Sequence, residues 1–231
     1  MTDNDEKKKR KVFHLEDIHE EPAVQKGIAK KINELYNTSQ IRAVFCENFE
    51  ETEEPIEPEF LYFLDKKASQ YLHLMKGTTV PIYGAENLEI HKDHIDVWRK
   101  IYNLQKELEK NEKKLEVFKN KLESGKGELS DIDEMKKVAG LLKEWVLLDA
   151  AEKEINALRS YYLAGHVMRV AERKNYGAVA IVCGAEHGKY LREFFEEYCH
   201  EYIPIAPELA FEREKPSLDS MMKSLERLLG K

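Results

Sequence analysis

The sequence predicts an α/β fold, in which a mainly parallel sheet is flanked by helices and carries an inserted antiparallel helical hairpin. Short apolar segments alternate with helix-periodic segments at both ends of the chain, as in βαβ units. The middle of the chain carries a long heptad-like apolar stripe that is interrupted by glycines. The 231 residues are 42% hydrophobic and 35% charged, which is typical of a globular protein with a substantial core.

Five short apolar runs are the predicted strands. They are rich in β-branched and aromatic side chains, which fit a pleated and half-buried surface. They cover residues 12–15, 41–46, 78–83, 178–183 and 202–205. The run at 178–183, AVAIVC, is the strongest signal. Pro81 makes residues 78–83 either an edge strand or an extended loop, because proline cannot donate a hydrogen bond to a central strand ladder.

Helices are predicted between these strands from the spacing of apolar residues. Residues 23–36 carry Val24, Ile28, Ile32 and Leu35 at intervals of three and four. Residues 60–75 are a second predicted helix, and another holds the two phenylalanines that follow the strand at 178–183. Near the C-terminus, residues 217–229 have an amphipathic pattern.

The helical hairpin is predicted for about residues 95–160. Its outgoing stripe comprises Val97, Ile101, Leu104, Leu108, Asn111, Leu115, Phe118 and Leu122. Two glycines at 125 and 127 interrupt the pattern. The stripe restarts at Met135, Val138, Leu142 and Trp145. The returning arm is either one long helix or two, and the hairpin either pairs only with itself or also provides a homodimer contact.

Composition and charge limit the domain organisations and the classes of partner that the sequence allows. Residues 1–11 are predicted to be a flexible tail of mixed charge, and residues 12–231 a single α/β domain with the inserted hairpin. The formal net charge of −7 argues against a nucleic-acid partner, which needs a clustered basic face. No apolar run reaches the roughly 20 residues that a membrane span needs. The three cysteines show no metal-type pairing, which favours a reducing, cytoplasmic location.

Polar side chains follow four of the five predicted strands. In chain order they are Asp17 and His19, Glu47, Glu86, and Gly184 with His187. In open parallel sheets, ligands bind beyond the carboxyl ends of the strands, which share one edge of the sheet. We therefore expect these residues to form one site.

Three of these residues are candidate metal ligands. His19, Glu47 and His187 offer imidazole nitrogens and a carboxylate, a set that suits zinc, manganese or cobalt better than calcium. A bound metal with an open position would lower the pKa of its water and create a nucleophile. Without a metal, either histidine is a candidate general base, oriented by Glu47. The simpler interpretation of each histidine alone is a hydrogen-bonded loop residue.

The remaining candidates have two interpretations each. Glu86 either acts in the site or caps the helix that begins nearby, since carboxylates favour helix N-termini. Gly184 is a candidate ligand-binding residue because its backbone can approach a ligand closely. His91 and His94 have the spacing of metal ligands on a helix, but a solvated helix face is the simpler interpretation.

Several short motifs resemble one protein superfamily. The segment 184–187, Gly-Ala-Glu-His, resembles the second Gly-x-x-His motif of the TraB/GumN and Tiki proteins, which are grouped with ChaN-like and erythromycin-esterase-like proteins. The segment 16–19 sits where that superfamily has its first such motif. Asp17 fits the acidic second place of this motif and is a candidate ligand-binding residue, whereas a glutamate replaces the glycine.

Three further segments are similar to the same superfamily. Glu47 matches the glutamate after its second strand, and residues 83–86 resemble its Tyr-Gly-x-Glu segment. The segment 159–164 resembles its Arg-Asn-x-x-Met-Ala helix, with Ser160 in place of asparagine. Arg159 is then a candidate for holding an anionic group or a developing oxyanion. An exposed helix charge is the alternative.

The resemblance implies a hydrolase-like enzyme that attacks an amide, ester or related bond of a small molecule or peptide with activated water, either with or without a bound metal. ChaN-like proteins handle haem or iron, so a haem-, iron- or metal-binding protein without catalysis is the second expectation. A protein that acts through contacts of its helical hairpin is the third.

Overall fold

The computed structural model describes residues 9–18, 21–57, 70–75, 78–124 and 129–207. Within these residues it contains an all-parallel sheet of five strands flanked by helices, which confirms the predicted α/β class. The described residues divide into two compact units. One runs to His94 and resumes at Glu154, and the other spans Ile95–Lys153. Within the described residues, no helix combines the length and the apolar character that crossing a membrane requires.

The strands are β1 (Lys11–Asp17), β2 (Val44–Glu50), β3 (Ile82–Glu86), β4 (Ala178–Gly184) and β5 (Glu201–Ile205). All five predicted strands are present, but two of them are displaced along the sequence. The strand predicted at 41–46 begins at Val44 and continues past Glu47. The strand predicted at 78–83 begins only at Ile82, after Pro81, and lies at one edge of the sheet.

The helices are α1 (Pro22–Asn37), α2 (Gln70–Leu74), α3 (Leu88–Glu123), α4 (Leu129–Arg173) and α5 (Gly188–Glu197), with a 3₁₀ turn, η2 (Ala185–His187), before α5. The returning arm of the hairpin is therefore one helix of 45 residues. Of the helix predicted at 60–75, only its end, α2, lies among the described residues. The predicted segment 217–229 lies outside them, as do residues 1–8 of the predicted tail.

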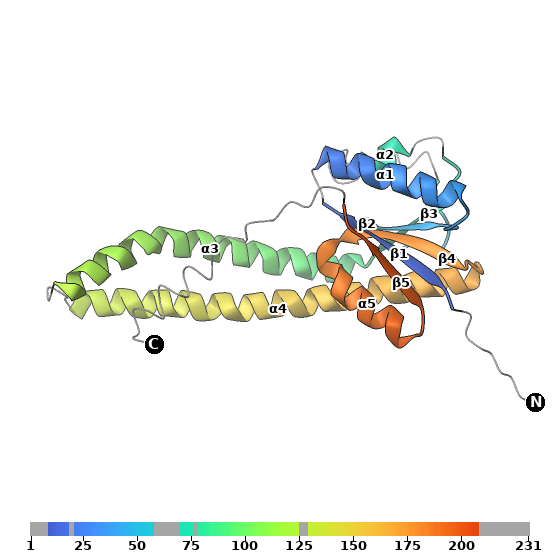
Figure 1. Cartoon of the computed structure of the whole chain (residues 1–231). Helices are drawn as coiled ribbons and strands as arrows, with labels where there is room; N and C mark the ends of the chain where they lie inside the picture. The colour runs from blue at the N-terminus through green and yellow to red at the C-terminus, as the bar shows by residue number, and fades with distance from the viewer. Residues whose placement is uncertain (1–8, 19–20, 58–69, 76–77, 125–128, 208–231) are drawn as a thin grey trace, which may run out of the picture. The chain divides into compact units, whose positions relative to one another are not determined.

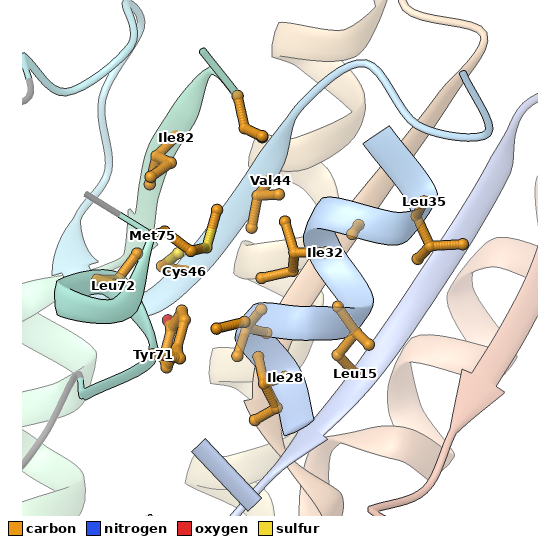
Figure 2. Close-up of a cluster of buried hydrophobic side chains, with 14 of the residues drawn as sticks. Leu15, Ile28, Ile32, Leu35, Val44, Cys46, Tyr71, Leu72, Met75 and Ile82 are labelled. Atoms are coloured by element: carbon orange, nitrogen blue, oxygen red, sulfur yellow. The ribbon is translucent and has the colours of Figure 1, made fainter. Parts of the chain in front are cut away.

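Helices cover both faces of the sheet (Figure 1). One face packs against α1 and α2, and its core is a cluster of aliphatic and aromatic side chains around Ile28, Ile32 and Leu35 of α1 (Figure 2). The other face packs against the last part of α4 and against α5, around Val167 and Phe195. Residues of β1 alternate between these two clusters, as the pleat of a strand requires.

The order of the strands brings the polar chain segments together. The sheet runs β3-β2-β4-β1-β5, so β4 lies between the two N-terminal strands. Asp17 pairs in register with Gly184, and Cys46 pairs with Val182 and also with Gly84. The register of β2 against β3 shifts between Cys46 and Glu50, at the point where Glu47 lies. The carboxyl ends of β1 to β4 therefore meet along one edge.

The second unit is a pair of antiparallel helices, which confirms the predicted hairpin. Its core consists of Leu104, Leu108, Val138 and Leu142. Among the described side chains, two ion pairs cross between the helices, with Lys114 Nζ 3.4 Å from Glu134 Oε1 and Lys137 Nζ 3.8 Å from Glu107 Oε1. The residue nearer the start of α3 pairs with the residue further along α4, as antiparallel packing requires. The homodimer contact stays a prediction.

Candidate functional site

Four of the predicted site residues converge at the carboxyl edge of the sheet. Glu47 comes from β2, Glu86 from the last position of β3, Arg159 from α4 and His187 from η2. All four side chains are buried. Residues far apart in the sequence therefore form one connected and buried polar cluster.

Arg159 is the centre of this cluster. Its Nη2 atom donates to Glu86 Oε2 at 2.6 Å and to Glu47 Oε1 at 2.7 Å, and its Nε atom donates to Glu86 Oε1 at 3.3 Å. The Nη1 atom donates to His94 Nδ1 at 2.9 Å. A planar guanidinium that bridges two carboxylates in this way fixes both of them, which a lysine ammonium could not do in the same geometry.

Glu47 is held on three sides. Its Oε1 atom accepts from Arg159 and lies 3.1 Å from His187 Nε2, and its Oε2 atom accepts from the backbone N–H of Gly184 at 2.9 Å. Burial alone would raise the pKa of Glu47, but His187, Arg159 and the Gly184 N–H together hold it well below its usual value. Glu47 is therefore ionised over the whole physiological range.

His187 is hydrogen-bonded through both ring nitrogens. Ionised Glu47 can only accept, so Nε2 carries a proton and donates to it. The Nδ1 atom lies 2.8 Å from Ser160 Oγ, whose hydroxyl also reaches the backbone carbonyl oxygen of Asn156 at 2.6 Å. The single hydroxyl hydrogen goes either to Asn156 or to His187, so the orientation of this hydroxyl is coupled to the protonation of the ring. Burial would lower the pKa of His187, but Glu47 raises it above its ordinary value.

The pKa values of the two buried carboxyl groups, Glu47 and Glu86, are shifted in opposite directions. Burial raises the pKa of Glu86 although Arg159 opposes the shift, while the pKa of Glu47 is lowered. The pKa of Arg159 itself is raised because the two carboxylates outweigh the effect of burial. Carboxyl groups whose pKa values are separated by their surroundings are a property of acid–base sites, and also of some structural ion networks.

Three residues of the cluster were not among those predicted for the site. Ser160 was noted only as a departure from a motif, and His91 and His94 were interpreted as a solvated helix face. His94 instead accepts from Arg159, so its ring carries a proton on Nε2 when neutral. His91 Nδ1 lies 3.5 Å from Glu86 Oε2. Their spacing of three on the first turns of α3, directly after Glu86, was the available signal.

Of the other predicted residues, Asp17 lies apart from the cluster, and Gly184 contacts it only through its backbone. Asp17 points to the face of the sheet that α1 covers, where Gln25 donates to its carboxylate. Gly184 contributes its backbone N–H to Glu47, and a Cβ atom there would overlap the carboxylate of Glu186. A ligand-binding role for either residue stays a prediction. His19 lies outside the described residues.

Two members of the predicted metal set, Glu47 and His187, lie among the described residues. Glu47 and His187 are brought together, but the bonds described above engage both carboxylate oxygens and Nε2 of the ring, and Arg159 already supplies the neighbouring positive charge. Across the described ranges, no group of three or more His, Cys, Asp or Glu side chains is placed to hold a metal ion. In this arrangement the two residues do not fit a divalent ion. A metal held with His19, and haem binding, stay predictions.

A further buried histidine, His14, lies on β1 near this cluster. Its Nε2 atom lies 3.3 Å from the carbonyl oxygen of Cys183, which can only accept, and its Nδ1 atom lies 2.6 Å from the hydroxyl of Tyr202. The neutral ring therefore donates from Nε2 and accepts the Tyr202 hydroxyl at Nδ1. Burial is the main cause that lowers the pKa of His14 to about 4. In the sequence it lies within the apolar run 12–15 and was not among the predicted site residues.

We expect His14 to make the fold acid-sensitive. In the unfolded chain a histidine gains its proton near pH 6.5, whereas folded His14 gains it only near pH 4. Between these values the unfolded state binds more protons, so the free energy of unfolding falls as the pH falls, by up to about 1.4 kcal/mol per pH unit. Urea unfolding across this window should show a shallower pH dependence for His14→Gln. Equal slopes would contradict the prediction.

Comparisons with known proteins do not assign the chain to a family. Nothing matches it among protein-family models, among curated proteins or among solved structures. The resemblance to the TraB/GumN, Tiki and ChaN-like proteins therefore stays a prediction. The site is interpreted from its own geometry.

Proposed function

We propose that the protein is a hydrolase that activates water with His187 and Glu47 and stabilises the resulting oxyanion with Arg159. One observation carries the proposal. A single buried arginine bridges two glutamates whose pKa values are displaced in opposite directions, and one of them orients a histidine. The substrate class is an amide, an ester or a related acyl compound.

His187 is the base in this proposal, through its Nδ1 atom. In the neutral ring Nε2 donates to Glu47, so the free electron pair is on Nδ1, which faces Ser160 Oγ. As the oxygen of water bonds to the acyl carbon, its proton passes to Ser160 Oγ and the serine hydrogen passes to Nδ1. Glu47 stabilises the imidazolium that forms, as the carboxylate does in catalytic triads. The proton returns to the leaving group when the bond to it breaks.

Arg159 supplies the positive charge. Contacts described above occupy four of its five N–H groups, and the remaining one is on Nη1. An N–H held rigidly at a buried position stabilises a developing oxyanion without the reorganisation that water would need. The bridging carboxylates keep this group in place, so their first role is to position it.

Substitutions of the cluster test the proposal on 4-nitrophenyl acetate and fluorescein-labelled casein. Ser160→Ala leaves the ion pairs intact, and we expect it to lower kcat by about 10²-fold because it interrupts proton transfer. Glu47→Gln should lower kcat by about 10³- to 10⁴-fold, since it removes the charge that stabilises the imidazolium. The rate should rise with pH through the pKa of His187, because only the neutral ring is a base.

Glu193→Gln, an exposed change on α5, is the matched control and should keep the wild-type rate. Circular dichroism establishes that each variant is folded. Wild-type turnover by folded Glu47→Gln, or by folded Ser160→Ala, would contradict the proposal. Metal analysis of the purified protein and a search for a Soret band after haem addition test the two binding expectations separately.

A further inference from the structure

Asn156 contains a buried polar atom that has no hydrogen-bond partner among the described residues. The residue is 6% exposed, and its Oδ1 atom has no hydrogen bond to the described part of the chain. Buried polar atoms in folded proteins are nearly always hydrogen-bonded, because leaving one unpaired forfeits the interaction it had with water. An unpaired acceptor at this position therefore needs an explanation.

The position of Asn156 links this atom to the site. Its backbone carbonyl oxygen accepts from Ser160 Oγ at 2.6 Å, one helical turn further along α4. Arg159 is three residues from Asn156, and residues three and four apart lie on the same side of a helix. The unpaired acceptor thus lies on the side of α4 that carries the proton path and the guanidinium.

Arg159 offers a matching donor. Its second Nη1 N–H has no hydrogen bond among the residues that the structure describes, while its other four N–H groups do. One side of α4 therefore carries an acceptor, Asn156 Oδ1, and a donor, on Arg159 Nη1, that make no hydrogen bond to the described residues. An amide group has the complementary pair, since its N–H donates and its carbonyl oxygen accepts. An ester has only the acceptor.

We infer that Asn156 is a substrate-binding residue whose Oδ1 atom accepts the N–H of an amide while Arg159 Nη1 donates to its carbonyl oxygen. The site is thereby selective for amides over esters. This inference rests on the proposed function and names its substrate class. Asn156 acts by binding and does not take part in the proton transfer.

Two small probes test the binding directly, without turnover. N-Methylacetamide and methyl acetate differ at the group that would face Asn156, as N–H and as ester oxygen. In NMR titrations we expect N-methylacetamide to shift the backbone amides of residues 156–160 saturably, and methyl acetate to have no such effect. Asn156→Leu should weaken the amide by about tenfold, as the loss of one hydrogen bond predicts. Equal shifts from both probes, or unchanged binding to Asn156→Leu, would overturn the inference.

The stability of the free protein gives an independent measurement. Asn156→Leu removes an acceptor that has no partner in the part of the chain that the structure describes, so the unfolding temperature should stay at or above the wild-type value. Asn103→Leu, at an exposed position of α3, is the matched control for the substitution itself. A fall of several degrees for Asn156→Leu alone would show that the amide is already paired within the protein, which overturns the inference.

Kinetics separate this inference from the proposed function. The probes are 4-nitroacetanilide and 4-nitrophenyl acetate, which share their acyl group and differ only in having an amide or an ester bond. Asn156→Leu should lower kcat/KM about tenfold for the anilide and leave the ester unchanged. An equal loss on both would overturn the inference and leave the proposed function standing. If the wild-type protein hydrolyses neither, the proposed function fails, and the NMR titration still decides whether Asn156 binds amides.

Discussion

Replacing Arg159 with methionine should lower the free energy of unfolding by about 3–5 kcal/mol. Methionine fills a volume similar to that of arginine, so the loss of stability comes from removing the positive charge. Glu47 and Glu86 would remain buried, and Arg159 is the cation that both of them contact. Burying a carboxylate without a partner costs far more than an exposed ion pair gains. Urea unfolding followed by circular dichroism measures the difference.

Arg169→Met is the matched control for this prediction. Arg169 lies on the same helix and is paired with Glu51 and Glu53, but its side chain is 56% exposed. Exposed ion pairs contribute at most about 1 kcal/mol. A loss as small for Arg159→Met as for Arg169→Met would show that the two carboxylates are solvated or protonated, and the ionised cluster described here would be wrong.

Gly84→Ala should destabilise the protein by about 1–3 kcal/mol, as overpacking typically does. A Cβ atom at Gly84 would overlap the backbone carbonyl oxygen of Glu50, which cannot turn away as a flexible side chain would. Thr52 is bonded to both backbone groups of Gly84, so the two chain segments are held close. The strands that carry Glu47 and Glu86 would have to separate. Thermal unfolding measures the loss.

Gly27→Ala supplies a control of opposite sign. Gly27 lies within α1, and a Cβ atom there would have no neighbour within 4 Å. Alanine stabilises a helix interior by about 0.5–1 kcal/mol relative to glycine. The two Gly→Ala variants should therefore shift the unfolding temperature in opposite directions. A stable Gly84→Ala protein would mean that β2 and β3 can separate at little cost.

The sequence was sufficient for the fold class because its periodic patterns are strong. The run at 178–183 is a strand flanked by helices, and the interrupted apolar stripe is a helix pair. The ends of the strands were harder to predict. A strand was predicted at residues 78–83 because several of their side chains are β-branched. In the structure, pairing with β2 begins only after Pro81. Tertiary pairing decides such ends, and local propensity does not.

Only part of the candidate site could be predicted from the sequence. Glu47, Glu86 and His187 could be found because parallel strands deliver their carboxyl ends to one edge. Ser160 and His94 lie on long helices, where any polar residue resembles a solvated one until its partner is known. His14 was overlooked because its neighbours are apolar, although a histidine on the buried side of a strand needs polar partners of its own.

The position of β4 also bears on how the chain reaches its native state. The two N-terminal strands do not pair with each other, because each lies against β4, more than a hundred residues further along the chain. A ribosome would expose both of them long before the strand that joins them is made. Sheets closed by such distant contacts form slowly. Their unpaired edges meanwhile invite association with other chains, so this protein should depend on chaperones during its synthesis.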